Sequence, residues 1–323
     1  AGDRVLAKPK FVDPAPQIDV EFYYPGNDLG VRYFSDYIQF KVWAPTARSV
    51  SILFYSGEVE KSEVLSAKMQ SGPLGTWIYK GDLTLDKKFY FYEVDVYNPV
   101  TGQQELNRVA DPWAYMSSED GRRSQVVNLS KPEYKPAGWD QLVKPKLEST
   151  LDSVLYEAHV RELTLQDTGV PTNLRGTYVG ITAPNSVARG HLLKLANAGV
   201  THIHLLPIHD FVSVRENKTT WQDVSALQKI MPDLRGREEP QRQIGLIRKE
   251  DGWNWGYDPV HFFIPDGSYA TRPENRILEV RKMVKEFNSL GLRVVMDLVF
   301  NHTFAAEQDS ILDQLVPGYF YRR

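Results

Sequence analysis

The chain has 323 residues, 42% of them hydrophobic, with a formal net charge of −3 and no cysteine. This length predicts two domains. The net charge argues against non-specific nucleic-acid binding, which requires a basic face, and the lack of cysteine excludes disulfides and thiolate metal sites. No apolar run reaches the roughly 18 residues of a membrane-spanning helix. A start at Ala1, without an initiator methionine, favours a secreted over a cytoplasmic protein without fixing the compartment.

The first part of the chain has the rhythm of short strands. Residues 1–30 carry no interpretable pattern and form an N-terminal extension. Beyond them, short apolar or alternating runs end at turn residues, at 38–43, 50–55, 76–79, 89–96 and 125–129. No long amphipathic helix interrupts these runs. The pattern predicts an all-β sandwich over residues 31–145.

After a proline-containing connector at 131–146 the rhythm changes. Strand-like runs alternate with helical spacing, and glycines end both predicted helices; the strands are expected at 154–160, 201–207 and 292–300 and the helices at 188–198 and 273–290. The last strand is almost continuously apolar, which predicts a strand covered on both faces. This alternation is typical of an α/β barrel or a doubly wound sheet. A polar stretch at about 212–252, predicted to be helical around 224–230, is interpreted as an insertion.

Three motifs in the second half occur in a fixed order. They are Leu155-Tyr156-Glu157-Ala158-His159-Val160-Arg161-Glu162, then Trp253-Asn254-Trp255-Gly256-Tyr257-Asp258-Pro259, and finally Asp297-Leu298-Val299-Phe300-Asn301-His302-Thr303. Together they resemble type I pullulanases, the starch-debranching enzymes of the α-amylase superfamily. Residues 40–47 resemble the start of the glycogen-binding sandwich module that precedes the barrel in that family.

The resemblance implies a fold and an activity. The implied fold is an immunoglobulin-like sandwich at 31–145, followed at 146–323 by the first three βα units of a (β/α)₈ TIM barrel, incomplete in this chain. The implied reaction is hydrolysis of α-1,6-glucosidic branch linkages in pullulan, starch or glycogen, by a retaining mechanism that uses two carboxyl groups. The family carries these carboxyl groups on its fourth and fifth barrel strands. We therefore expect no catalytic residue in this chain, which should be inactive alone.

The missing carboxylates are expected in a segment after Arg323. That C-terminal part of the same enzyme is the expected protein partner, either continuous or as a second chain produced by cleavage at Arg322-Arg323. An open fragment of a barrel would leave a sheet edge and apolar surface uncovered, so the remainder should pack against it.

The resemblance also implies site residues. Tyr257 and His302 match family positions that hold the sugar ring beside the scissile bond, where such residues act at the carboxyl ends of the barrel strands. For Asp258 two roles stay open, a turn residue or a substrate contact. For Trp255 the alternatives are a packing role and a place in the substrate site. Asp297 is expected to support the site rather than to attack the substrate.

In the sandwich module, Trp77 is a candidate for stacking on glucan, whereas Trp43 is assigned to the core. Asn301 matches a calcium ligand of many α-amylases, but one oxygen does not make a site of six to eight ligands. Calcium is thus a candidate ion, and no cofactor is required. His159 is assigned to interior ion pairing, and Asp210 has nothing beyond its acidity to recommend it as a catalyst.

The expected partners are α-glucans, namely pullulan, starch, glycogen and limit dextrins, and neither nucleic acid nor membrane. Two other functions stay open: a non-catalytic α-glucan-binding protein, and another α-amylase-superfamily enzyme such as an isoamylase or a branching enzyme. Hydride or phosphate chemistry lacks the glycine-rich loop that it needs.

Overall fold

The computed structural model describes residues 14–59, 64–222, 250–306 and 309–321, together with 238, 242 and 245–247. The helix predicted around 224–230 lies outside these residues. Contacts divide the chain into two compact units, Ala1–Trp113 with Ala305–Arg323, and Ala114–Phe304. Within the described ranges, none of the helices is both long and apolar enough to cross a membrane.

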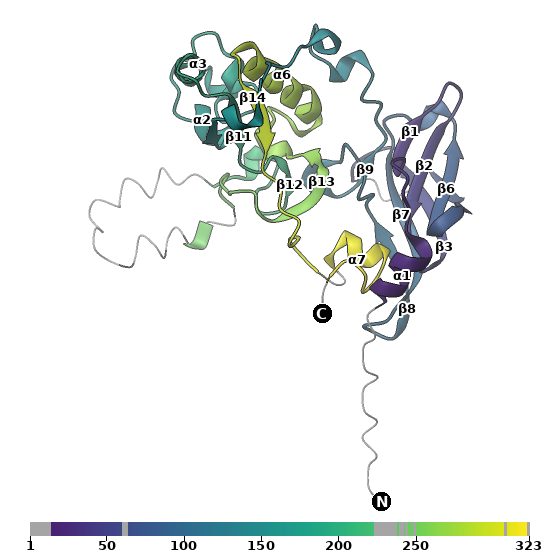
Figure 1. Ribbon diagram of the computed structural model, residues 1–323. Coiled ribbons are helices and arrows are strands. Elements are labelled where there is room, and N and C mark those ends of the chain that lie inside the picture. Colours follow the sequence, from purple (N-terminus) through teal and green to yellow (C-terminus); the bar gives the residue numbers. More distant parts are fainter. Residues whose placement is uncertain are drawn as a thin grey trace, which may run out of the picture. The chain divides into compact units, whose positions relative to one another are not determined.

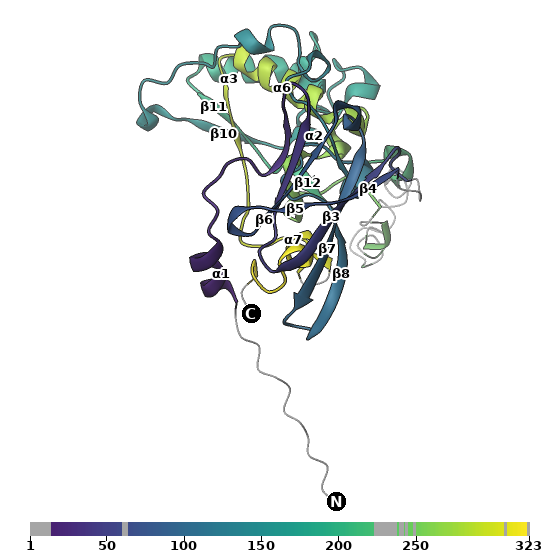
Figure 2. The ribbon, with the colours of Figure 1, turned by 90° about the vertical axis from the view of Figure 1, so that its right-hand side faces the viewer.

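The first unit is built from two antiparallel sheets, coloured purple to blue in Figure 1. Their strand orders are β1-β2-β6-β5 and β4-β3-β7-β8. The strands are β1 (Gly30–Tyr33), β2 (Ile38–Trp43), β3 (Ala47–Tyr55), β4 (Leu65–Lys68), β5 (Gln70–Ser71), β6 (Thr76–Gly81), β7 (Phe89–Asn98) and β8 (Gln103–Val109). Figure 2 shows β3, β7 and β8 running alongside one another. The ring of Phe40 on β2 meets those of Phe54 and Tyr90 on the other sheet, at 5.2 and 5.4 Å between centroids.

This architecture confirms the predicted sheet-rich N-terminal module. Strand β2 has the predicted bounds, and β3, β6 and β7 cover the predicted runs and extend beyond them. Strands β1, β4, β5 and β8 and helix α1 (Ala15–Phe22) were not predicted. In β8 most side chains are polar and only Val109 is buried, so its sequence shows no buried face.

The compact units divide the chain at residue 113 rather than at the predicted boundary of 145. Residues 305–321 also belong with the first unit. Helix α7 (Ile311–Leu315) explains this, because the Asn107 side chain on β8 donates to the Gln314 carbonyl at 3.0 Å. The ring of Trp43 further packs edge-on against Tyr319, with centroids 5.0 Å apart.

A three-stranded parallel sheet organises the second unit. Its order is β10 (Leu155–Ala158), β11 (His202–Leu205) and β14 (Arg293–Met296), with Tyr156, Ile203 and Val294 side by side. These are the three predicted strands, each shorter than expected. The predicted helices correspond to α3 (Val187–Asn197) and α6 (Arg276–Ser289); a short helix α2 (Val160–Thr164) follows β10. Figure 1 shows β11 and β14 close to α6.

The two glycines predicted to end the helices, Gly199 and Gly291, follow α3 and α6 in the structure. Gly199 and Gly291 have φ of +105° and +87°, a region that favours glycine. At the other end of α3, the Ser186 hydroxyl accepts the amide N–H of Arg189 at 3.1 Å. Leu192 on α3 and Met283 and Phe287 on α6 are buried in the apolar core shared with the sheet.

Two predicted strands of this unit are shorter than expected, and one of them is also less covered. The run at 292–300 was expected to be covered on both faces, but β14 ends at Met296 and Phe300 is 75% exposed. The run at 125–129 contributes only β9 (Ser124–Gln125). An antiparallel hairpin of β12 (His209–Phe211) and β13 (Pro259–Pro265) was not predicted, because its two strands flank the polar stretch.

Candidate functional site

Tyr257, Asp297 and His302 lie together beyond the carboxyl end of β14. The Tyr257 hydroxyl donates to Asp297 Oδ2 at 2.6 Å, and His302 Nε2 is 2.6 Å from the Tyr257 carbonyl oxygen. Asp297 follows β14 directly, and its amide donates to the Leu205 carbonyl at 3.0 Å. The sequence-predicted pair of Tyr257 and His302 is therefore adjacent, at the strand end where parallel α/β sheets place ligands.

The electrostatics of this group assign a protonation state to Tyr257. Burial and the hydrogen bond to Asp297 raise the pKa of Tyr257 to about 12. The phenol is thus a neutral donor at physiological pH, and one oxygen of Asp297 accepts its hydrogen bond. This arrangement suits Asp297 to orienting the tyrosine ring. The His302 side chain is exposed, so its ring remains accessible from solvent.

Asp258 points one carboxylate oxygen at a protein donor and leaves the other unpaired. The Ser213 hydroxyl donates to Oδ2, whereas Oδ1 is buried and has no hydrogen-bond partner within the described residues. Burial raises the pKa of Asp258. A buried acceptor without a donor is costly. Ser213 was not identified from the sequence, because it lies in the polar stretch without a motif.

Trp255 is 52% exposed, and its ring meets that of Trp253 edge-on with centroids 5.7 Å apart. Between them, the Asn254 carbonyl oxygen lies 2.9 Å from His159 Nε2. His159 is buried at the end of β10, and burial lowers its pKa, so the ring is neutral. The predicted interior ion pair for His159 was wrong: the imidazole instead fixes the backbone of the tryptophan segment.

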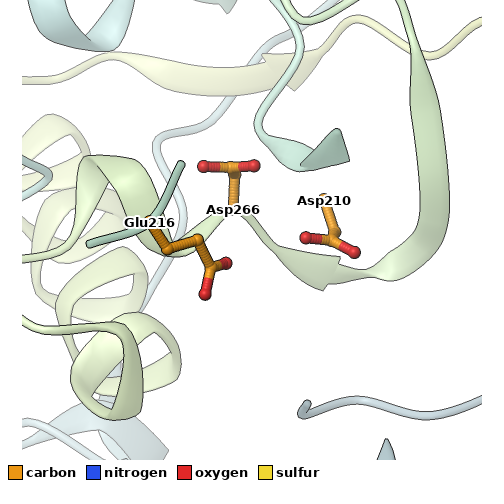
Figure 3. Close-up of side chains that lie close together, drawn as sticks. All are labelled: Asp210, Glu216 and Asp266. Atoms are coloured by element: carbon orange, nitrogen blue, oxygen red, sulfur yellow. The ribbon is translucent and has the colours of Figure 1, made fainter. Parts of the chain in front are cut away.

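A cluster of buried carboxylates lies in the same unit. Oxygens of Asp210, Glu216 and Asp266 come within 4.8 Å of one another, and Figure 3 shows the three side chains gathered in one place. Arg276 Nη2 is 2.6 Å from Glu216 Oε2, and His261 Nδ1 is 2.7 Å from Asp210 Oδ2. Burial raises the pKa of Glu216 to about 7 and that of Asp266 well above its ordinary value.

The donor set of this cluster does not fit a metal ion. Glu216 accepts the backbone N–H groups of Asp120 and Gly267 at 2.9 and 2.8 Å as well as the guanidinium. Asp266 accepts the Phe211 amide at 3.1 Å and the amide and hydroxyl of Ser268. A hard cation needs several oxygens with free lone pairs, and here the guanidinium supplies the positive charge. The cluster instead holds β12 and β13 together, through the hydrogen bonds of Asp266 to Phe211 and of Asp210 to His261. Strand β13 begins immediately after Asp258.

The three remaining residues singled out from the sequence are Asn301 in the second unit and Trp77 and Trp43 in the first. The side chain of Asn301 is exposed. Trp77 is half-buried on β6, and its indole N–H donates to the Ala44 carbonyl at 3.0 Å. Trp43 is buried and donates to the Phe22 carbonyl at 3.0 Å, which confirms its assignment to the core.

Residues 28–114 match the family model of carbohydrate-binding module 48, described as the isoamylase N-terminal domain. Over 95% of its length the chain is 40% identical to "Pullulanase 1, chloroplastic" of Arabidopsis thaliana, and over 100% of its length it is 34% identical to a pullulanase of Klebsiella pneumoniae. The crystal structure of ligand-free PulA from Klebsiella pneumoniae matches 94% of the chain with a TM-score of 0.87 at 33% identity. The chain spans 32% and 33% of the two curated relatives and 33% of that crystallised chain.

Proposed function

Because the chain belongs to the pullulanase family, we propose that it forms part of an enzyme that hydrolyses α-1,6-glucosidic branch linkages. The proposed substrates are pullulan, starch, glycogen and limit dextrins, and the proposed mechanism is a retaining double displacement. Solved structures of the Klebsiella pneumoniae relative are described as maltotriose complexes. That ligand is an α-glucan fragment of the proposed substrate class.

The observation that carries this proposal is the group formed by Tyr257, Asp297 and His302. A neutral phenol ring held by a carboxylate can stack on the apolar face of a sugar. The exposed imidazole beside it can exchange hydrogen bonds with sugar hydroxyls. Asp258, which lies next to Tyr257 in the chain, and the exposed Trp255 are the proposed further contacts. Interactions of this kind accelerate the reaction where they strengthen in the transition state.

The catalytic carboxylates are proposed to come from a segment outside this chain. Strands β10 and β14 are the two edges of the parallel sheet, and neither has a second strand partner in the described part of the chain. Leu155 and Met296 on these strands are exposed apolar side chains. In a (β/α)₈ barrel, further strands would pair with both edges and cover such surface. We therefore interpret the sheet as the first three βα units of a barrel, with the rest of the polypeptide as its partner.

The experiment uses the enzyme that contains this chain and follows reducing ends released from pullulan. His302→Ala should lower kcat/KM about 100-fold, which corresponds to about 2.7 kcal/mol of lost transition-state stabilisation. His191→Ala is the matched control, because His191 is also an exposed histidine of the same unit. Equal activities of the two variants would contradict the assigned site. Hydrolysis by the 323-residue chain alone would contradict the external carboxylates.

A second function, α-glucan binding without catalysis, is favoured specifically by the module 48 match at residues 28–114. In this module, the half-buried ring of Trp77 is the proposed stacking surface. Trp77→Ala should weaken binding to insoluble starch, whereas Tyr97→Ala, at an exposed aromatic residue of the same unit, should not. Starch binding together with an inactive full enzyme would replace the hydrolase proposal by this one.

A further inference from the structure

Residues 309–321 follow the proposed site in the chain but belong with the first unit. They contain helix α7, which Figure 1 shows in yellow beside β8. His302 lies in the second unit, and only Thr303 and Phe304 separate it from Ala305, the residue at which the chain returns to the first unit. The first unit therefore holds the chain a few residues beyond a side chain of the proposed site.

Side-chain hydrogen bonds fix this segment to both α1 and β8. The Tyr319 hydroxyl donates to Asp19 Oδ1 on α1 at 2.7 Å. The Asn107 bond to the Gln314 carbonyl provides the link to β8. Burial and the hydrogen bond to Asp19 raise the pKa of Tyr319 to about 12. The phenol therefore stays protonated at physiological pH and retains its donation to Asp19.

Apolar packing adds to these hydrogen bonds. Leu315 and Val316 are fully buried. The ring of Trp43 on β2 meets the rings of Tyr319 and Phe320 edge-on, with centroids 5.0 and 6.3 Å apart. Close-packed side chains and edge-to-face rings have few alternative arrangements, so the segment has a defined place on the sandwich.

His302 depends on its backbone for its position, because its own side chain is exposed. Its Nε2 atom lies 2.6 Å from the Tyr257 carbonyl oxygen, and two residues later the Phe304 amide donates to the Pro259 carbonyl at 3.0 Å. Farther along, the chain is held by the first unit. A short connection with both ends fixed has few conformations left, so the restraint at 309–321 limits where His302 can lie.

From these contacts we propose that Tyr319 is a positioning residue of the enzyme: by fixing the 309–321 segment on the sandwich, it keeps His302 in the place where the sugar ring binds. The inference rests on the proposed function, since it needs His302 to contact the substrate. Tyr319 itself is assigned no contact with the sugar. A displacement of about 1 Å at a site can cost about 100-fold in rate. The first unit then contributes to the reaction through the path of the chain, independently of any glucan that it binds.

The test is a double-mutant cycle in the enzyme that contains this chain, with kcat and KM measured on pullulan. Tyr319→Ala should lower kcat about tenfold and leave KM within about twofold, because the contact made by His302 is proposed to strengthen in the transition state. In an enzyme that already carries His302→Ala, the same substitution should lower kcat less than about twofold, because the side chain that it positions is gone.

Two further variants separate positioning from a general loss of stability. Tyr37→Ala is the matched control, because the Tyr37 ring also meets another ring of the first unit, that of Phe34, with centroids 4.5 Å apart. It should lower the free energy of unfolding as Tyr319→Ala does, yet leave kcat within about twofold. Tyr319→Phe keeps the ring against Trp43 and loses the bond to Asp19, so it should lower kcat only about threefold, and only while His302 is present.

The outcomes separate the two proposals. An equal loss of kcat with and without His302 would overturn the positioning role, because Tyr319 would then act through stability alone. Unchanged kcat in Tyr319→Ala, with hydrolysis still dependent on His302, would also overturn it and leave the proposed function standing. If His302→Ala is as active as the unaltered enzyme, the proposed site fails, and the positioning role fails with it. If Tyr319→Ala does not fold, the same cycle with Tyr319→Phe decides.

Discussion

The two units stabilise buried carboxylates in different ways. In the first unit, the buried Asp111 accepts the hydroxyls of Tyr90 and Tyr92 at 2.8 and 3.1 Å. In the second, three carboxylates gather around the guanidinium of Arg276, which is itself fully buried. One buried carboxylate can be stabilised by neutral donors, whereas several within a few ångströms require a cation or a bound proton. The second unit should therefore be the more sensitive to charge and pH.

The largest expected effect is the loss of the buried cation. Arg276→Met should lower the free energy of unfolding of the second unit by about 3–5 kcal/mol at pH 8, because the carboxylates lose their counter-charge. Arg272→Met is the control, since Arg272 forms an exposed ion pair with Glu274 and its loss should cost less than about 1 kcal/mol. Urea unfolding followed by circular dichroism measures both. Similar midpoints for the two variants would show that Arg276 does not balance the cluster.

The same contrast explains what the sequence could reveal. Strand β2 was predicted with correct bounds, because its apolar and polar residues alternate within six neighbouring positions. Glu216 and Arg276 are 60 residues apart, and Glu216 lies in a polar stretch without periodicity. A pairing of that kind depends on tertiary structure and leaves no local pattern.

The candidate site was predicted from the sequence in part, unlike β2, which was predicted fully, and the Glu216–Arg276 pair, which was not predicted. Tyr257 and His302 were selected by family motifs, and their positions in the structure bring them together. Ser213 could not be assigned a place in the site from spacing alone, because its partner Asp258 comes from a segment far along the chain. The role of His159 was predicted wrongly, because a strand pattern does not reveal a contact with the Asn254 carbonyl.

A smaller loss is expected when the buried carboxylate of the first unit loses a neutral donor. Tyr90→Phe removes one hydroxyl from Asp111 and should cost about 1–3 kcal/mol of unfolding free energy. Tyr97→Phe, at an exposed position of the same unit, should change it by less than about 0.5 kcal/mol. Thermal or urea unfolding distinguishes the two. A cost for Tyr90→Phe as large as that for Arg276→Met would remove the proposed difference between the units.

The cluster should also give the second unit a characteristic pH dependence. Burial raises the pKa of Glu216 from 4.5 to about 7, so between these pH values the folded state binds more protons than the unfolded state. The free energy of unfolding contributed by Glu216 should therefore fall as pH rises from about 4.5 to 7, by at most about 1.4 kcal/mol per pH unit. Relative to Glu216→Gln, the unaltered chain should lose stability over this range. A pH-independent difference between the two would refute the assignment.

His159 should show the opposite sign and the smallest effect. Burial lowers the pKa of His159 below 6.5, so acidification favours the unfolded or opened state, in which the imidazole can bind a proton. The stability that His159 contributes is present above that pH and is lost as pH falls. His159→Ala should lower the local free energy of opening around Asn254 by about 1 kcal/mol, and His159→Gln, which keeps a donor, should restore part of it. Hydrogen exchange of the Gly256 amide, which donates to the Asn254 side chain, measures this opening. If exchange at Gly256 is the same in all three chains, His159 does not anchor the tryptophan segment.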